Sequence, residues 1–268
     1  MFQKETAIRL ITALILLPLL AVIWFGGMAA LVLALGFVLF MTVELTFSAR
    51  AGRFDMIGML IVVTISMPAG LALWAGHYDT DPAGINMAGI YMAGTLMALA
   101  IFFVGLFSFR HISGVIMMLL LAGLGLSLIA MLRLDHGGIW LVLALVTVAV
   151  VDTMGFLVGR KLGGAKLWPA ISPAKTWSGA FGGVLFSPVP ILIYAVISGE
   201  DMRFALFGGV LAILAIAGDL MESWYKRCHD LKDIGRILPG HGGMLDRFDG
   251  SLLAIPMLYL LLANGWLG

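Results

Sequence analysis

Four polar residues that could do chemistry together close a long apolar run: Asp219, Glu222, Ser223 and Lys226. Their spacing of i, i+3, i+4 and i+7 places all four on one face of a helix. Asp219 lies inside the apolar run, and a carboxylate within a membrane span is costly to bury and usually functional. The alternative is that Asp219 only pairs with Lys226 or reaches water at the membrane surface.

A glycine-rich loop follows, with the sequence Pro-Gly-His-Gly-Gly-Met-Leu-Asp-Arg-Phe-Asp from Pro239 to Asp249. Its glycines let backbone amides approach a ligand, and adjacent amides of this kind can cradle a phosphate. Asp246 and Asp249 are three residues apart, so they project together if a helix begins here. Carboxylates near basic side chains suit Mg²⁺, a hard cation that prefers oxygen ligands. The alternative is a solvated, turn-rich loop whose charges face water.

A second polar region lies upstream, between Asp152 and Gly179. Asp152 is another acid within an apolar run. The segment from Ser172 to Thr176 reads as a short polar turn at the head of the next run, where a helix N-terminus, Lys175 and two hydroxyls could hold an anion. An ordinary N-cap followed by a lysine at the membrane surface explains these residues equally well.

Several other polar residues are assigned no site. Glu44, near the inner end of an apolar run, either lines a cavity or caps or pairs with another group. The triplet His136-Gly137-Gly138 has no converging acids, and we interpret its likeness to the later His-Gly-Gly as coincidence. No Walker-type glycine-rich loop is present, which argues against ATP hydrolysis of that kind. Cys228 is the sole cysteine, which excludes an intrachain disulfide.

The elements that must position these residues are membrane helices. Of the 268 residues, 62% are hydrophobic and only 12% are charged, against about 25% charged in soluble domains. A net charge of +1 gives no bulk attraction to nucleic acid. Apolar runs recur that are long enough to cross about 30 Å of hydrocarbon. We predict one all-α membrane domain, with N-terminal spans in residues 1–137, catalytic spans and loops in residues 138–268, and nine spans: residues 8–25, 28–48, 56–76, 87–108, 112–132, 138–158, 178–198, 203–222 and 251–267.

Basic residues set the orientation of these spans. With the N-terminus in the cytoplasm, every Lys and Arg falls on the cytoplasmic side except Arg133 and Arg203. The C-terminus is then outside. The charged loop after the eighth span, from Lys226 to Asp249, is cytoplasmic and can meet a soluble substrate.

The segment from Ser223 to Asp249 resembles the signature of the phosphatidate cytidylyltransferases, also called CDP-diacylglycerol synthases. The family pattern asks for Ser, Lys-Arg, Lys-Asp, Pro-x-His-Gly-Gly and Asp-Arg-x-Asp at fixed spacing. Its positions are all filled here, by Ser223, Lys226, Arg227, Lys232, Asp233, Pro239, His241, Gly242, Gly243, Asp246, Arg247 and Asp249. The upstream region resembles a second family stretch through Asp152, Gly159, Gly163, Ser172, Pro173, Lys175 and Thr176.

The resemblance implies that the phosphate of phosphatidic acid attacks the α-phosphorus of CTP, giving CDP-diacylglycerol and pyrophosphate. Such a transfer depends mostly on positioning and charge neutralisation. We therefore expect Mg²⁺, as one cation or two, to be bound by Asp219 and Asp246, with Asp249 helping. These acids and Lys226 form the expected catalytic set. The expected substrate contacts are Asp152, Ser172, Lys175, Thr176, Ser223, Arg227, Lys232, Asp233, His241, Gly242, Gly243 and Arg247.

Two residues depart from the family pattern, which usually has Glu or Gln in place of Ser178 and Ser in place of Gly250. Neither departure removes a phosphate or metal group, so the expected activity stands and details of nucleotide contact are affected.

The expected partners are CTP, phosphatidic acid and membrane lipids, with no nucleic acid and with a homodimer only by analogy to the family. The expected location is the bacterial cytoplasmic (inner) membrane, with the site facing the cytoplasm. One alternative is an ion-coupled secondary transporter, but its acids would sit near the midplane of inverted repeats. Another is a CDP-lipid synthase or lipid kinase acting on a different lipid.

Overall fold

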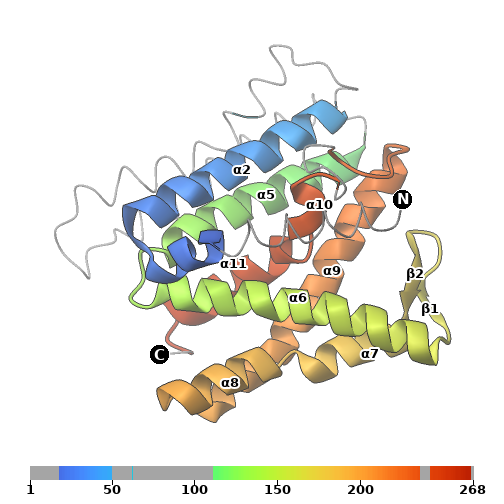
Figure 1. The fold of residues 1–268 in the computed structure, drawn as a ribbon. Coiled ribbons are helices and arrows are strands. Elements are labelled where there is room, and N and C mark those ends of the chain that lie inside the picture. The colour runs from blue at the N-terminus through green and yellow to red at the C-terminus, as the bar shows by residue number, and fades with distance from the viewer. Residues whose placement is uncertain (1–17, 50–61, 63–110, 236–241, 267–268) are drawn as a thin grey trace.

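The computed structural model describes residues 18–49, 62, 111–235 and 242–266, and these are mostly helical (Figure 1). Residues 18–25 form a helical segment before the first labelled helix. The elements that follow are α2 (Gly27–Ala49), α5 (Ile112–Met131), α6 (Gly137–Leu162), β1 (Lys166–Trp168), β2 (Ser172–Thr176), α7 (Trp177–Phe186), α8 (Val189–Ser198), the short 3₁₀ helix η1 (Met202–Ala205), α9 (Leu206–Cys228), α10 (Leu245–Phe248) and α11 (Ser251–Ala263).

The described helices are those of a membrane protein. Five segments are long and apolar enough to cross a bilayer: Gly27–Ser48, Ile112–Met131, Gly137–Leu162, Trp177–Ser198 and Met202–Cys228. They coincide with five predicted spans. The last predicted span corresponds to α11, which has 13 residues. The predicted spans 56–76 and 87–108, and most of 8–25, lie outside the described residues, so the number nine stays a prediction.

Successive membrane spans run in alternating directions, and the contacts between helix ends fit such an arrangement. Ser48 near the end of α2 hydrogen-bonds to Tyr225 near the end of α9, with 2.8 Å between their hydroxyl oxygens. Trp24, just before the start of α2, and Trp140, near the start of α6, both pack their rings on Tyr194 of α8, at centroid distances of 6.4 and 6.3 Å. These two groups of contacts lie at opposite ends of the bundle, whereas the membrane side that each faces stays a prediction.

Helices α6 and α7 approach closely because glycines line their contact. A Cβ added at Gly179 would lie 2.5 Å from the carbonyl oxygen of Gly155, and one added at Gly182 would lie 2.6 Å from the Cβ of Val158. Small residues permit this approach between membrane helices. This packing fixes the start of α7 against α6, and with it Lys175, which lies two residues before α7.

The segment predicted as a turn, Ser172 to Thr176, is instead strand β2. It pairs antiparallel with β1, so that Lys166 faces Thr176 and Trp168 faces Ser172. The all-α prediction is wrong for this hairpin, which lies to the right in Figure 1. The physical reason is the turn at residues 169–171, where the N–H of Ile171 donates to the carbonyl of Trp168 at 3.2 Å and the chain reverses so that β2 can pair with β1. Gly163 and Gly164, with positive φ angles of 62° and 102°, end α6 and lead the chain into β1.

The predicted span 178–198 is interrupted where α7 ends and α8 begins. Pro188 has no N–H group to donate to the carbonyl of Val184, and the hydroxyl of Ser187 donates to that carbonyl instead, at 2.7 Å. Side chains commonly satisfy the backbone groups that proline frees in membrane helices. The two halves together still form one segment of spanning length.

Candidate functional site

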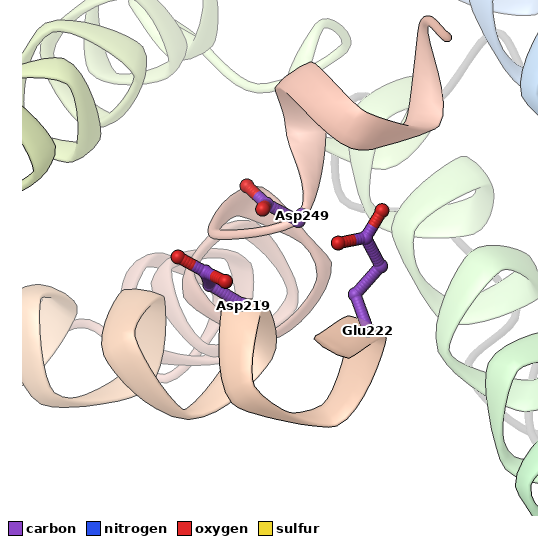
Figure 2. A group of neighbouring side chains, drawn as sticks. All are labelled: Asp219, Glu222 and Asp249. Carbon is purple, nitrogen blue, oxygen red and sulfur yellow. The ribbon is translucent and has the colours of Figure 1, made fainter. Parts of the chain in front are cut away.

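Three carboxylates converge where α9 passes Asp249, in the short connection between α10 and α11. Asp219 and Glu222 project from one face of α9 toward Asp249, as Figure 2 shows. One oxygen from each residue lies within 4.8 Å of the others. The helical face predicted from the spacing of Asp219 and Glu222 is confirmed, and it brings these two acids of α9 to Asp249, which follows them by 30 and 27 residues.

Two glycines allow this convergence. A Cβ at Gly218 would lie 2.5 Å from the carbonyl oxygen of Asp249, so only glycine lets α9 come this close to the segment that bears Asp249. A Cβ at Gly250 would lie 2.9 Å from Cγ1 of Val148 on α6 and 3.4 Å from Cβ of Ala215. The tight packing explains why a glycine at position 250, which departs from the family pattern, suits this chain.

Two lysines approach the acids from different elements. Lys175, at the end of the hairpin, forms an ion pair with Asp219, which also accepts a hydrogen bond from the hydroxyl of Ser223 at 3.3 Å. Lys226 on α9 lies 2.6 Å from Glu222 and 3.1 Å from Asp246, measured from its Nζ to the nearest carboxylate oxygen. The structure therefore joins the upstream and downstream polar regions in one site, as the sequence predicts.

Asp246 shares Lys226 with Glu222 but accepts more backbone N–H groups than the three converging acids. Its carboxylate accepts hydrogen bonds from the backbone N–H groups of Ile234 (3.0 Å) and Gly243 (2.9 Å), and from Lys226 (3.1 Å). Both carboxylate oxygens therefore face the backbone of the loop. The expected role of Asp246 as a metal ligand stays a prediction.

The donor set fits a hard divalent cation. Burial, and then the neighbouring Asp219 and Asp152 carboxylates, raise the pKa of Asp249 to about 8. Glu222 is fully buried, and its Oε1 has no hydrogen-bond partner among the described residues. Crowded carboxylates repel one another, a bound cation relieves that repulsion, and oxygen ligands suit Mg²⁺.

Several other predicted site residues also have defined positions. Asp152 on α6 lies close enough for its charge to act on Asp249, and Lys175 and Arg247 act on Asp152 in turn. Thr176 caps α7, since its hydroxyl oxygen accepts the backbone N–H of Gly179 at 3.1 Å. The ordinary N-cap role is therefore present at Thr176.

The remaining predicted residues lie around the edge of the site. Arg227 donates from Nε to the carbonyl of Ile171 at 3.2 Å, which ties α9 to the hairpin. Ser172 is paired within that hairpin, and Lys232 and Asp233 are exposed in the loop after α9. A Cβ at Gly242 would lie 3.4 Å from Asp246, and Gly243 donates to the same carboxylate. His241 lies outside the described residues.

Two acids near the site are absent from the expected set. Glu222 shares a helical face with Asp219, and that spacing is a signal that could have identified it as a candidate ligand. Glu44 on α2 accepts hydrogen bonds from Met244 and Leu245, both at 2.9 Å. Of the two roles considered for Glu44, capping is the one observed, although no sequence signal pointed to its partners about 200 residues away.

A protein-family model matches most of this chain, and known proteins match about half of it. The model of the cytidylyltransferase family matches residues 7–264. A phosphatidate cytidylyltransferase of Bacillus subtilis is 42% identical over 135 residues, covering 49% of this chain and 50% of that protein. A phosphatidate cytidylyltransferase of Staphylococcus haemolyticus is 38% identical over 159 residues, covering 58% of this chain and 61% of that protein. The matches thus span between half and 61% of these relatives' length. The extent of the family match is decisive: the chain belongs to the cytidylyltransferase family.

Proposed function

We propose that this membrane protein is a CTP:phosphatidate cytidylyltransferase, which transfers CMP from CTP to phosphatidic acid. One observation carries the proposal: Asp219, Glu222 and Asp249 converge beside Lys175 and Lys226. Carboxylates for a cation and two separately mounted ammonium groups are what a reaction between two phosphate substrates needs. The names of the relatives support CTP and phosphatidate as those substrates.

In the proposed reaction, an oxygen of the lipid phosphate forms a bond to the α-phosphorus of CTP as the bond to the pyrophosphate oxygen breaks. The attacking phosphate oxygen is already ionised near neutral pH, so the protein needs no general base. Mg²⁺ bound by Asp219, Glu222 and Asp249 would neutralise charge on the phosphates. Asp246 is proposed to act beside this group through Lys226, with which it pairs at 3.1 Å.

The two lysines are proposed to bind different phosphate groups. Lys175 is mounted on the hairpin and Lys226 on α9, so they approach the acids from separate directions. Both ammonium groups are paired with carboxylates. Each is proposed to exchange this pairing for a phosphate when substrates and Mg²⁺ bind, one on the lipid and one on the nucleotide.

The location of the site supports entry of a lipid headgroup. Asp219 lies within the apolar segment Met202–Cys228, while Asp246 and Asp249 follow the loop after that segment. The acyl chains of the lipid are proposed to stay in the bilayer as its phosphate reaches the end of α9. The basic loops favour a site on the cytoplasmic side of a bacterial cytoplasmic membrane.

The direct test uses the purified protein in detergent with labelled CTP, phosphatidic acid and Mg²⁺. The expected products are lipid-linked CMP and an equal amount of pyrophosphate. Asp201→Asn is the matched control, because Asp201 forms an exposed pair with Arg203 away from the site. Failure to form lipid-linked CMP with any divalent cation would overturn the proposal, and a preference for another lipid phosphate would replace phosphatidic acid as the substrate.

A further inference from the structure

A buried carboxylate on α2 holds the start of the segment that carries two site acids. Glu44 is only 2% exposed. Its Oε1 accepts the backbone N–H of Met244 and its Oε2 accepts that of Leu245, both at 2.9 Å. Each oxygen therefore binds a different residue at the beginning of α10, which leads directly to Asp246 and Asp249.

The loop backbone is packed tightly around Glu44. A Cβ at Gly235 would lie 2.3 Å from its Oε1, and a Cβ at Gly243 would lie 2.9 Å from the same atom. Gly235 and Gly243 thus both contact this one carboxylate, and neither contact leaves room for a side chain. The positions of these two glycines therefore depend on the place of the Glu44 oxygens.

Asp246 binds the same two backbone segments. It accepts N–H groups from Ile234 and Gly243 and pairs with Lys226. Glu44 and Asp246 together therefore fix the two ends of the loop to each other and to α2. Hydrogen bonds to an ionised carboxylate are about twice as strong as neutral ones, so the restraint is a firm one.

We propose that Glu44 is a positioning residue of the active site. Acting through the backbone of Met244 and Leu245, it sets the start of α10 so that Asp246 meets Lys226 and Asp249 meets Asp219. This inference rests on the proposed function, because it gives Glu44 a part in that reaction. A residue that merely stabilised the fold would lower thermal stability without changing the properties of the folded site.

The test compares Glu44→Gln with Thr46→Val in the full-length protein. The amide of Gln has nearly the shape of the carboxylate but places an NH₂ group against one of the two N–H donors. Thr46 is a matched control on the same helix, fully buried, whose hydroxyl bonds only to the carbonyl of Thr42 in the residues described. Glu44→Asp is a second variant, which keeps the charge and withdraws it by one methylene group.

Three measurements separate positioning from simple stabilisation. In substrate-free protein, hydrogen exchange of peptides covering residues 242–249 should be about tenfold faster in Glu44→Gln, as expected for loss of a charged hydrogen bond. Exchange in α5 should not change. Mn²⁺ binding, followed by electron paramagnetic resonance, should weaken at least about fivefold. With substrates, kcat should fall about tenfold or more while the KM for CTP changes less. Thr46→Val should leave all of these unchanged, and Glu44→Asp should lie between.

The inference is overturned if Glu44→Gln lowers the melting temperature while hydrogen exchange at residues 242–249 and Mn²⁺ affinity match the wild type. It is also overturned if α5 exchanges faster by the same factor, since the effect is then global. If the wild-type protein forms no lipid-linked CMP, the proposed function fails, yet the exchange and Mn²⁺ measurements still decide whether Glu44 positions the carboxylates.

Discussion

Two sets of carboxylates lie within one small region and have opposite surroundings. Asp219, Glu222 and Asp249 face one another, and their partners are mainly side chains: Lys175 and Ser223 at Asp219, and Lys226 at Glu222. Glu44 and Asp246 instead accept backbone N–H groups from the loop before α10. All five are acids in or beside apolar segments, so residue type alone does not separate them. Backbone donors do.

The difference has a direct physical meaning. A carboxylate that accepts several N–H groups is stabilised as an anion and has few free lone pairs. Carboxylates that are crowded against one another repel, and a bound cation relieves this repulsion. We therefore expect the first set to bind the metal and the second to shape the loop.

The largest effect should come from Asp219→Asn. The change removes a proposed metal ligand and the partner of Lys175, and the loss of several kcal/mol of charge stabilisation corresponds to roughly a thousandfold fall in kcat. Initial rates with labelled CTP, measured at saturating Mg²⁺, test this expectation. Asp201→Asn should retain the wild-type rate. A fall of less than about tenfold in Asp219→Asn would remove Asp219 from the metal group.

A sharper comparison sets Glu222→Gln against Asp246→Asn. Glu222→Gln should weaken Mn²⁺ binding at least about tenfold, as even residues that only support metal ligands can have effects of this size. Asp246→Asn should lower the melting temperature more and Mn²⁺ affinity less, because it removes acceptors for loop N–H groups. If metal binding is instead lost only in Asp246→Asn, Asp246 is a metal ligand, as expected from the sequence. The two sets of carboxylates then do not have separate roles.

The close approach of the α9 backbone to Asp249 can be tested with Gly218→Ala. The new Cβ would lie 2.5 Å from the carbonyl oxygen of Asp249, so Asp249 must move away from Asp219. We expect a destabilisation of about 1–3 kcal/mol, typical of overpacking, together with reduced Mn²⁺ affinity. Gly209→Ala on the same helix is the control, because its Cβ meets open space and should be neutral or slightly stabilising. Equal metal affinity in the two variants would show that the acids tolerate displacement.

The smallest effect should come from Thr176→Ala, which removes an uncharged hydroxyl near the charged groups. The change removes the N-cap of α7 and should cost about 1 kcal/mol of stability. Thermal unfolding measures this cost, and kcat at saturating CTP should stay within about threefold of wild type. A much larger loss of activity than of stability would mean that Thr176 contacts a substrate, as the family resemblance implies.

Local patterns made much of this site predictable. Asp219, Glu222 and Lys226 share a helical face because their spacing fixes it, and the five supported spans follow from the length of their apolar runs. The hairpin was missed because β1 and β2 are short and lack the alternation of apolar residues that marks a strand. Glu44 was left undecided because its partners lie about 200 residues away, and no local pattern encodes such a contact.

The hydrogen bonds from Met244 and Leu245 to Glu44 also constrain the order of steps in folding. Chain synthesis at roughly 5–20 residues per second separates α2 from its partners by about 10–40 s. During that interval α2 and α9 can both be inserted, while Glu44 still lacks these two donors. The two bonds, and with them the placing of Asp246 and Asp249 by α2, must therefore wait until residues 244 and 245 have been made.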